Sequence, residues 1–192
     1  MTTNPLRPDK PRIEPVDLDA VDDDLRELLG KTMVRGGKAL NIFATLAHNP
    51  GLLKRFNVLA GFFMTRSSVP DRDRELVVLR VGANAGAVYE FGQHTIIGRR
   101  AGLSDDEILR LTQPLDDDWS DDDRLLLTMA DELCEHDAVS DATWRGLAAR
   151  WSTAELLELV LLAGTYRLVS GFLNAVGVEL DDGVPGWPGA HA

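Results

Sequence analysis

The sequence predicts an all-α fold, and three observations support this prediction. Apolar residues recur at helical spacing through most of the chain, residues that cap helices stand before several of these segments, and no segment has the alternation typical of a strand. Val77-Val78-Leu79 is the best strand candidate, but the proline and the charged turn before it favour a helix. We therefore expect a compact multi-helix domain.

Three helices are predicted in the first third of the chain. A short acidic helix over residues 17–29 can end at Gly30. Two apolar helices follow over residues 39–48 and 52–64, separated by Asn49-Pro50-Gly51, which is a strong break.

Two further helices carry most of the chemically interesting residues. Pro70 suits the first turn of a helix whose pattern weakens at Gly82. Asp71 and Asp73 are favourable near the N-terminus of this helix, where the helix dipole is positive. The next helix is predicted from Tyr89 to Arg100, stopped by Ala101-Gly102.

Serine residues mark the starts of the remaining helices. Capping boxes are predicted at Ser104 to Glu107 and at Ser152 to Glu155, the second before a long apolar helix towards Val176. Ser120 and Ser140 each cap a further helix, to about Glu135 and about Arg150.

The two ends are expected to lie outside the helical domain, which spans residues 17–180. Residues 1–16 contain four prolines and predict an extended arm that can wrap a neighbouring subunit. Residues 181–192 form a tail, in which Trp187 either anchors the tail in a surface groove or stays loose.

Two segments predict a homo-oligomer. Residues 38–64 and 152–176 are apolar over most of the helix circumference, which in a protein of this size indicates an interface between subunits.

Composition bounds the function and location. The net charge of -11 disfavours binding to nucleic acid or to an anionic membrane, whereas a small anionic substrate needs only local arginines. No apolar run approaches the roughly 20 residues of a membrane span, and the first residues lack the features of a signal peptide, so a cytoplasmic protein is expected.

The single cysteine, Cys134, excludes a CxxC centre, and its helical spacing from Leu126 and Leu127 favours a small buried side chain over a reactive thiol.

Glu90 and His94 stand one helical turn apart, which places both side chains on one helix face. A carboxylate beside an imidazole favours the imidazolium and orients the ring for acid–base work, and Tyr89 adds a hydrogen-bond donor for an oxyanion. The alternative is a surface ion pair without function.

Glu75 begins a strongly apolar helix, so it is either partly desolvated with a raised pKa or a first-turn acid that pairs with Arg72 or Arg74. Glu75, Glu90 and His94 could serve a divalent ion, but no HExxH motif or second histidine supports a metal site.

The most distinctive stretches are Ala47 to Pro50, Arg74 to Leu76, Tyr89 to His94 and Ala101 to Ser104. Together they resemble the carboxymuconolactone decarboxylase/alkyl hydroperoxidase D-like superfamily, over about residues 38–111. The resemblance implies an all-α fold that assembles as a dimer, trimer or hexamer.

The resemblance is to a cysteine-free member. In peroxidase-type members a Glu precedes a CxxC motif and a His; Glu75 and His94 match that Glu and His, while Ala87 and Glu90 occupy the two cysteine positions. Peroxide reduction through a disulfide requires both thiols, so that activity does not carry over.

The resemblance instead implies chemistry like that of the decarboxylase branch, which acts on a lactone bearing a carboxylate next to an acidic carbon. It implies that His94 donates or accepts a proton, with Glu90 as its partner and Glu75 as a second acid–base group. Tyr89 and Arg80 are implied contacts to a carboxylate or oxyanion, and no cofactor is expected.

Three hypotheses follow for the function. The first is a cofactor-free acid–base enzyme that acts on a small carbonyl or lactone acid by decarboxylation, ring opening or isomerisation. The second is a small-molecule binding module that keeps the scaffold without the chemistry. The third is a peroxidase-like redox protein that uses Cys134 alone.

Overall fold

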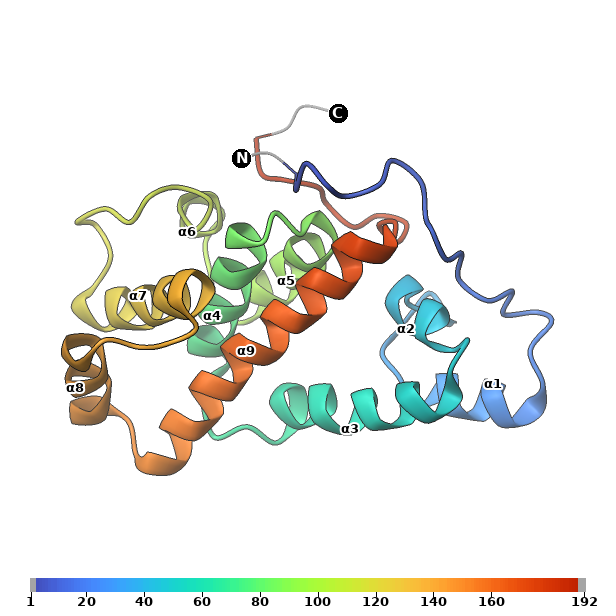
Figure 1. Ribbon diagram of the computed structural model, residues 1–192, viewed down its shortest axis with the longest axis horizontal. Coiled ribbons are helices and arrows are strands. Elements are labelled where there is room, and N and C mark those ends of the chain that lie inside the picture. Colours follow the sequence, from blue (N-terminus) through green and yellow to red (C-terminus); the bar gives the residue numbers. More distant parts are fainter. Residues whose placement is uncertain (1–2, 190–192) are drawn as a thin grey trace.

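The computed structural model describes residues 3–189, which fold mostly into helices (Figure 1). Parts of the predicted arm (1–2) and tail (190–192) lie outside the described residues. In chain order the elements are α1 (Asp23–Gly30), β1 (Val34–Arg35), β2 (Lys38–Ala39), α2 (Asn41–Leu46), α3 (Pro50–Thr65), α4 (Asp71–Asn84), α5 (Val88–Arg100), α6 (Asp105–Arg110), α7 (Asp121–His136), α8 (Asp141–Arg150) and α9 (Thr153–Val176).

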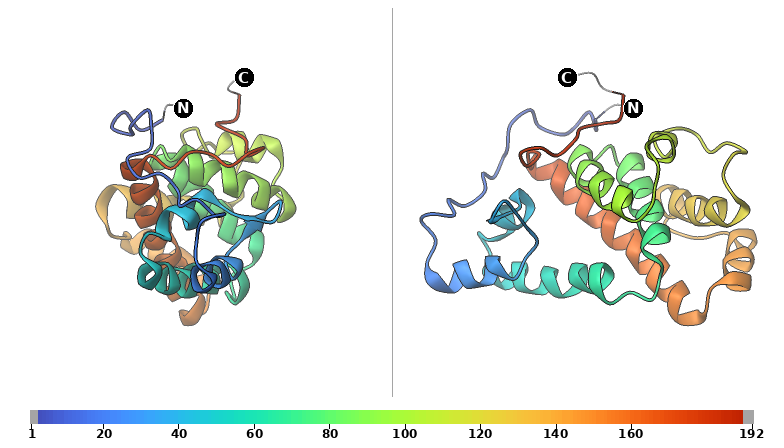
Figure 2. Two further views of the ribbon diagram at one scale, coloured as in Figure 1. Left: turned by 90° about the vertical axis from the view of Figure 1, so that its right-hand side faces the viewer. Right: turned by 180° about the vertical axis from the view of Figure 1, so that it is seen from behind.

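The long helix α9 runs diagonally across the molecule and connects its two sides (Figures 1 and 2). Helices α4 and α5 lie behind α9, with α6, α7 and α8 to one side and α1, α2 and α3 to the other. Apolar side chains from α4, α7 and α9 form the larger core, and a second core joins α2, α3 and the end of α9.

Helix α4 is the most buried element. Every residue from Asp73 to Ala83 is buried, and the apolar side chains between Leu76 and Val81 have no exposed surface. A helix buried on all sides is stable only when other helices surround it and its charged side chains are paired. The helix prediction for Val77-Val78-Leu79 is confirmed, although Pro70 caps the helix instead of occupying its first turn.

The serine caps are confirmed. Ser104 and Ser152 form complete capping boxes, and the side chains of Ser120 and Ser140 accept hydrogen bonds from backbone N–H groups of the first turn. Because each cap satisfies N–H groups that the helix cannot, these helix starts were readable from the sequence.

Three helix boundaries differ from the predictions. The acidic helix begins only at Asp23, because Asp22 is its cap. Helix α3 begins at Pro50, since proline fits the first helical position and Asn49 caps it. The predicted helix over residues 39–48 shrinks to α2, because its first residue belongs to a strand.

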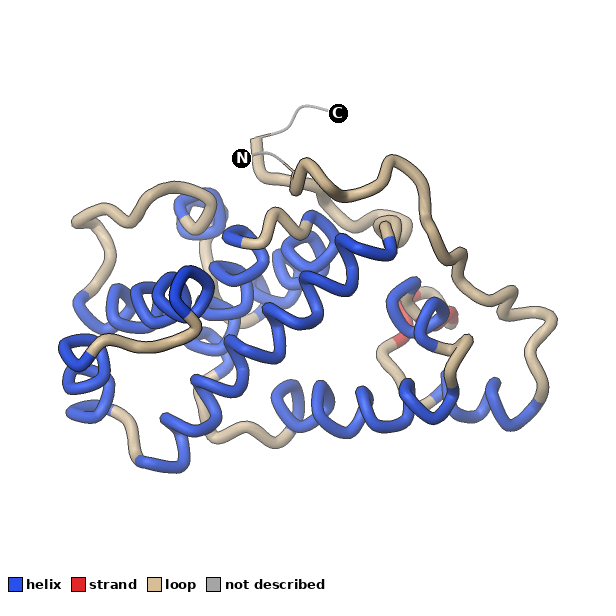
Figure 3. Tube along the Cα trace, in the orientation of Figure 1, coloured by secondary structure: helices blue, strands red, loops and turns tan. Residues whose placement is uncertain are grey.

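The strictly all-α prediction is wrong in one place. Strands β1 and β2 form a short antiparallel hairpin in which Arg35 pairs with Lys38 (Figure 3). Gly36 and Gly37 connect the strands with φ values of 57° and 80°, a left-handed conformation that glycine adopts without strain.

The N-terminal arm lies along its own chain in the structure. The backbone N–H of Asn4 donates to Gly86, that of Arg12 to Val176 and that of Val16 to Ala44, over distances of 2.8–3.2 Å. In this chain the arm therefore covers the ends of α9 and α2.

The C-terminal tail is anchored as far as it is described. The ring of Trp187 packs against Phe91 of α5, with centroids 4.9 Å apart. Gly92 makes room for this contact, because a Cβ there would lie 2.3 Å from the carbonyl oxygen of Pro185.

The expectation that no apolar run approaches the length of a membrane span is corrected by α9. In the described part of the chain it is the one helix long and apolar enough, by composition, to cross a membrane. It packs against α4, α5, α7 and α3, and this central position accounts for much of its apolar surface. Leu157, Leu161 and Leu168 remain exposed on its outer side.

Candidate active site

The candidate site lies where α4 meets α5. His94 Nδ1 is 2.6 Å from Glu75 Oε2, and His94 Nε2 is 3.2 Å from Glu90 Oε1. The imidazole is therefore held between two carboxylates, one from each helix. Glu75 and His94 are thus in direct contact, which their separation of 19 residues did not reveal.

Close packing of the two helices makes this contact possible. One turn after His94, α5 carries Gly98, where a Cβ would lie 3.2 Å from Leu79 and 3.8 Å from the Cβ of Glu75. The missing side chain allows α5 to approach α4 at the level of Glu75.

Burial and charge determine the protonation state of His94. Burial alone lowers the pKa of His94, but the neighbouring carboxylates of Glu75 and Glu90 outweigh burial and raise it to about 10. The ring is therefore an imidazolium at neutral pH. Glu90 and His94 are only 4% and 6% exposed, so they are not a surface ion pair.

Glu75 is completely buried and is shared by two cations. Its Oε1 accepts a hydrogen bond from Arg74 Nε at 2.8 Å, while its other oxygen contacts His94. Burial lowers the pKa of Arg74, but Glu75 and Asp71 together raise it above its ordinary value. Desolvation and pairing with Arg74 were alternatives in the sequence, and the structure shows both.

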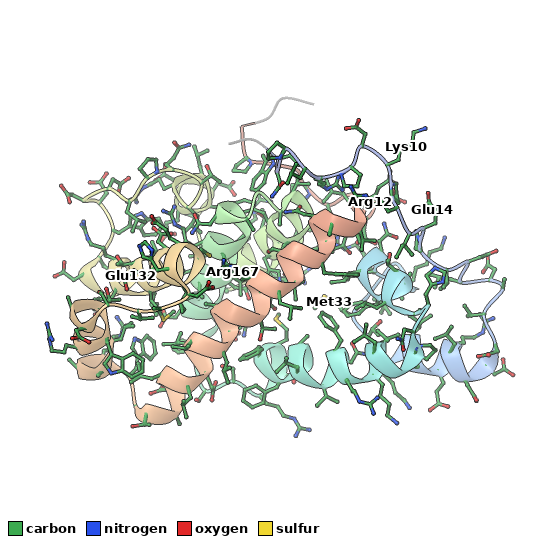
Figure 4. The ribbon with its side chains drawn as sticks, in the orientation of Figure 1. Lys10, Arg12, Glu14, Met33, Glu132 and Arg167 are labelled. Atoms are coloured by element: carbon green, nitrogen blue, oxygen red, sulfur yellow. The ribbon has the colours of Figure 1, made fainter. Side chains whose placement is uncertain are left out.

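A pocket opens beside this cluster. It has about 560 Å³ of empty space, counted with its open mouth, and its walls are mostly apolar. Figure 4 shows Met33 between α9 and the α2–α3 side of the molecule, where the pocket lies. The lining residues are Met33, Leu40, Ile42, Phe43, Phe56, Ala60, Met64, Tyr89, Glu90, Gln93, His94, Ile97, Thr165, Tyr166 and Val169. Glu90 and His94 thus face the pocket, whereas Glu75 lies behind them.

Tyr166 forms a wall of the pocket against His94. The two rings meet edge to face, with centroids 4.9 Å apart and an interplanar angle of 88°. Burial, with Glu90 and Glu75 nearby, raises the pKa of Tyr166 well above its usual value, so its hydroxyl stays protonated. That hydroxyl lies 3.3 Å from the sulfur of Met64.

Tyr89 lines the pocket, but its hydroxyl is already engaged. It donates to Asp181 Oδ2 at 2.6 Å and accepts from the backbone N–H of Ile42 at 3.2 Å. Burial and Asp181 raise the pKa of Tyr89, so the phenol remains neutral. The expected donation from Tyr89 to a substrate oxyanion would require breaking its bond to Asp181.

Arg80 is not part of this site, which corrects the expectation that it contacts substrate. Its guanidinium pairs with Asp131 through Nε and Nη2 at 2.6 and 2.7 Å. Its Nη1 donates to the carbonyl oxygens of Leu111 and Gln113. Arg80 therefore links α4 to α7 and to the segment after α6, with its donors occupied.

Cys134 also lies away from the pocket lining. It is half-buried in α7, and burial raises the pKa of its thiol, which disfavours the thiolate that peroxide reduction needs. Across residues 3–189, no group of three histidine, cysteine or acidic side chains has a geometry suited to a metal ion.

Gln93 and Tyr166 line the site and were not predicted as functional residues. Gln93 lies three residues after Glu90 on the same helix face, so helical spacing could have found it. Tyr166 comes from α9, and only the tertiary fold brings it to His94.

A family comparison matches the segment that contains the site. The carboxymuconolactone decarboxylase family model matches residues 50–114, the segment that carries Glu75, Glu90 and His94. No curated protein sequence matches the chain at a significant level.

Solved structures share the fold. A peroxidase-related protein with an alkylhydroperoxidase AhpD core from Ralstonia eutropha JMP134 has a TM-score of 0.77 and 20% identity, over 90% of this chain and 93% of that one. The debrominase Bmp8 has a TM-score of 0.74 and 16% identity, over 89% of this chain and 92% of that one. A peroxidase-related protein from Silicibacter sp. TM1040 has a TM-score of 0.74 and 17% identity, over 95% of this chain and 97% of that one.

The fold is therefore that of the AhpD-like helical proteins. Over residues 50–114 the chain is similar to the carboxymuconolactone decarboxylase family, and it has no CxxC pair. One of the solved structures that share the fold is a debrominase.

Proposed function

We propose that the chain is a cofactor-free acid–base enzyme that acts on a small carbonyl or lactone acid. One observation carries this proposal: a buried imidazolium, held between two carboxylates, faces a mostly apolar pocket together with one of them. Pairs of titratable groups in different environments are typical of acid–base sites.

The proposed roles follow from which groups reach the pocket. Glu90 removes a proton from the carbon next to the substrate carbonyl, and the C–H electron pair moves into the carbonyl to give an enolate. The imidazolium of His94 stabilises the enolate oxygen while Glu90 returns its proton to carbon, or His94 protonates carbon and then regains a proton from Glu90; either route completes an isomerisation. In a decarboxylation the C–C electron pair takes the same route, CO₂ leaves, and His94 protonates the carbon before water restores its proton.

Glu75 acts as a positioning residue in this proposal, because it does not line the pocket. Its carboxylate fixes the orientation of the imidazole and favours the charged ring, while Arg74 holds the carboxylate from the other side.

A binding module without catalysis is the second candidate, and one observation favours it. Both ring nitrogens of His94 already face carboxylates, as they would in a purely structural ion-pair cluster. In that case the pocket holds a small molecule and the cluster only supports its wall.

Proton exchange separates the two candidates without knowledge of the natural substrate. Small γ-lactone acids and keto acids would be incubated with the protein in D₂O, and loss of each C–H signal followed by ¹H NMR. An acid–base enzyme accelerates this loss for at least one acid, and His94→Gln slows it by about 100-fold or more.

His136→Gln is the matched control, because His136 is an exposed histidine outside the pocket. Binding of an acid with no exchange above the background rate would support the binding module and overturn the enzyme.

We further propose a cytoplasmic homo-oligomer in which a second copy covers the outer faces of α3 and α9. The exposed apolar residues there are Leu52, Val58, Leu59, Phe62, Leu157, Leu161 and Leu168. The acidic surface makes nucleic acid and anionic membranes poor partners. Light scattering of the wild type and of Val58→Glu tests this, since a charge at the centre of an interface shifts the mass towards the monomer.

A further inference from the structure

Several hydrogen-bond donors in the pocket wall are already engaged by carboxylates of the protein. Tyr89 and Gln93 both donate to Asp181, at 2.6 and 2.5 Å. The two ring nitrogens of His94 each face a carboxylate as well. A carbonyl group that enters the pocket is therefore best served by a different donor in the wall.

Tyr166 carries a donor that is not engaged in this way. Its hydroxyl donates to the sulfur of Met64 at 3.3 Å, and both side chains line the pocket. A thioether sulfur is a weak acceptor, so exchanging it for a carbonyl oxygen is favourable. The contact with Met64 thus keeps the hydroxyl paired in the free protein and leaves it available to a ligand.

The position of Tyr166 places this donor beside the acid–base pair. Its ring meets the ring of His94 edge to face, with centroids 4.9 Å apart. Burial, together with the charges of Glu90 and Glu75, raises the pKa of the phenol well above its usual value. The phenol therefore keeps its proton and serves as a hydrogen-bond donor, not as a base.

The surroundings of Tyr166 strengthen such a hydrogen bond. Its side chain is buried, and the pocket wall is mostly apolar. In surroundings of low dielectric constant a fixed donor stabilises a developing negative charge more than it does in water. The oxygen of an enolate carries more negative charge than the carbonyl oxygen from which it forms. The hydroxyl therefore contributes most in the step in which that charge develops.

We infer that Tyr166 is a catalytic residue, which donates a hydrogen bond to the carbonyl oxygen of the substrate and to the enolate oxygen formed from it. The inference deepens the proposed function and rests on it for the reaction. When Glu90 takes the proton from the neighbouring carbon, the C–H electron pair moves into the carbonyl, and Tyr166 stabilises the oxygen without transferring its own proton. The hydroxyl shares this oxygen with His94 in one route and holds it alone when His94 protonates carbon.

The infrared band of a bound carbonyl group reports this hydrogen bond directly. The probe is γ-butyrolactone, a small neutral lactone whose carbonyl stretch lies above the amide bands of the protein. A hydrogen bond to the carbonyl oxygen lowers the stretching frequency. The wild type is expected to show the lowered band. Tyr166→Phe keeps the ring and removes only the hydroxyl, so its bound lactone should absorb at higher frequency, as in an apolar solvent.

Proton exchange measures the effect on the reaction. For the compound whose C–H exchange in D₂O the wild type accelerates, Tyr166→Phe should slow the exchange by about 100-fold, the usual effect of removing one oxyanion donor. The dissociation constant of γ-butyrolactone should rise by no more than about tenfold, because a neutral carbonyl gains less from the donor than an enolate does. A side chain that only supports the wall would not separate the two effects in this way.

Ser170→Ala is the matched control, because it also removes a buried hydroxyl from α9. Ser170 is not among the described residues that line the pocket, and within residues 3–189 its hydroxyl has no hydrogen-bond partner. The control should leave both the band and the exchange rate unchanged. Thr165→Val tests the other hydroxyl that α9 brings to the pocket.

Three results would each overturn the inference. They are an unchanged band in Tyr166→Phe, a band that moves in Thr165→Val and not in Tyr166→Phe, and failure of the wild type to bind the lactone. The outcome for the proposed function is separate. A band that depends on Tyr166, without exchange of any compound, supports Tyr166 as the residue that binds the carbonyl and rejects the enzyme. Exchange as fast in Tyr166→Phe as in the wild type supports the enzyme and rejects the role of Tyr166.

Discussion

Helix α4 carries two buried arginine clusters, and their comparison separates a site from a structural support. The Arg80 cluster joins a guanidinium to Asp131 and to two backbone carbonyls, away from the pocket that His94 lines. The Arg74 cluster joins a guanidinium to Glu75 and, through it, to the imidazole of His94 beside a pocket. Both clusters are well hydrogen-bonded, so hydrogen bonding alone does not distinguish them.

The clusters differ in whether they place a titratable histidine beside the pocket. The Arg80 cluster contains no histidine, and none of its residues lines the pocket. In the other cluster, His94 can gain or lose a proton, and Glu90 carries its charge to the pocket surface. A titratable group next to an accessible cavity therefore indicates function more reliably than buried charge does.

The largest expected effect comes from removing the shared carboxylate of the Arg74 cluster. Glu75→Gln leaves Arg74 and His94 without the anion between them, and should lower the free energy of unfolding by about 3–5 kcal/mol. Urea denaturation followed by circular dichroism measures this loss, with the exposed Glu27→Gln as control. A loss below about 1 kcal/mol would mean that the cluster is not held together by Glu75.

Breaking the Arg80 cluster should lower the free energy of unfolding by less than Glu75→Gln does, and it should not affect the groups at the pocket. Arg80→Gln removes the partner of Asp131, which is still partly exposed, and should lower the free energy of unfolding by about 2–3 kcal/mol. The pKa of His94, measured by NMR, should not move. If it did move, the two clusters would be coupled and the comparison would fail.

The pH dependence of stability should come from the Arg74 cluster. His94 has a pKa near 10 in the folded chain and near 6.5 when unfolded, so its stabilisation is complete below about pH 6.5 and is lost as the pH rises towards 10. The steepest loss is about 1.4 kcal/mol per pH unit. Urea denaturation across this range measures the slope, and His94→Gln should flatten it. An equal slope in that variant would assign the effect to another group.

The smallest expected effect comes from removing the longer of the two carboxylate contacts of His94, the one with Glu90. Glu90 lies 3.2 Å from His94, against 2.6 Å for Glu75, so Glu90→Gln should lower the pKa of His94 by only about one unit. An NMR titration of the four histidines, with the exposed His136 as internal reference, measures this shift. A larger shift than in Glu75→Gln would reverse the assignment of the two carboxylates.

Much of the fold could be predicted because its signals are local. The serine caps and the apolar run of α4 depend on neighbours within one or two helical turns, and both were confirmed. The hairpin was missed because its strands contain only two residues each, too few for an alternating pattern. The Gly36-Gly37 pair between two short extended stretches was the signal that could have revealed it.

The site was only partly predictable. Glu90 and His94 share a helix face, so their contact follows from spacing. The contact of His94 with Glu75 depends on how α4 and α5 cross, and Gly98 controls that approach through space. Arg80 was assigned wrongly because its partner Asp131 is 51 residues away, and nothing near Arg80 in the sequence shows that its donors are occupied.

Asp181 has a consequence for how the chain is made. It lies 92 residues after Tyr89 and 88 after Gln93, yet it accepts hydrogen bonds from both. The acceptor that holds these two lining residues is thus synthesised only after α9. A nascent chain that ends before Asp181 has the residues that line the pocket but lacks the carboxylate that fixes Tyr89 and Gln93. Ligand binding is therefore expected to stabilise a chain that includes Asp181 more than a shorter one.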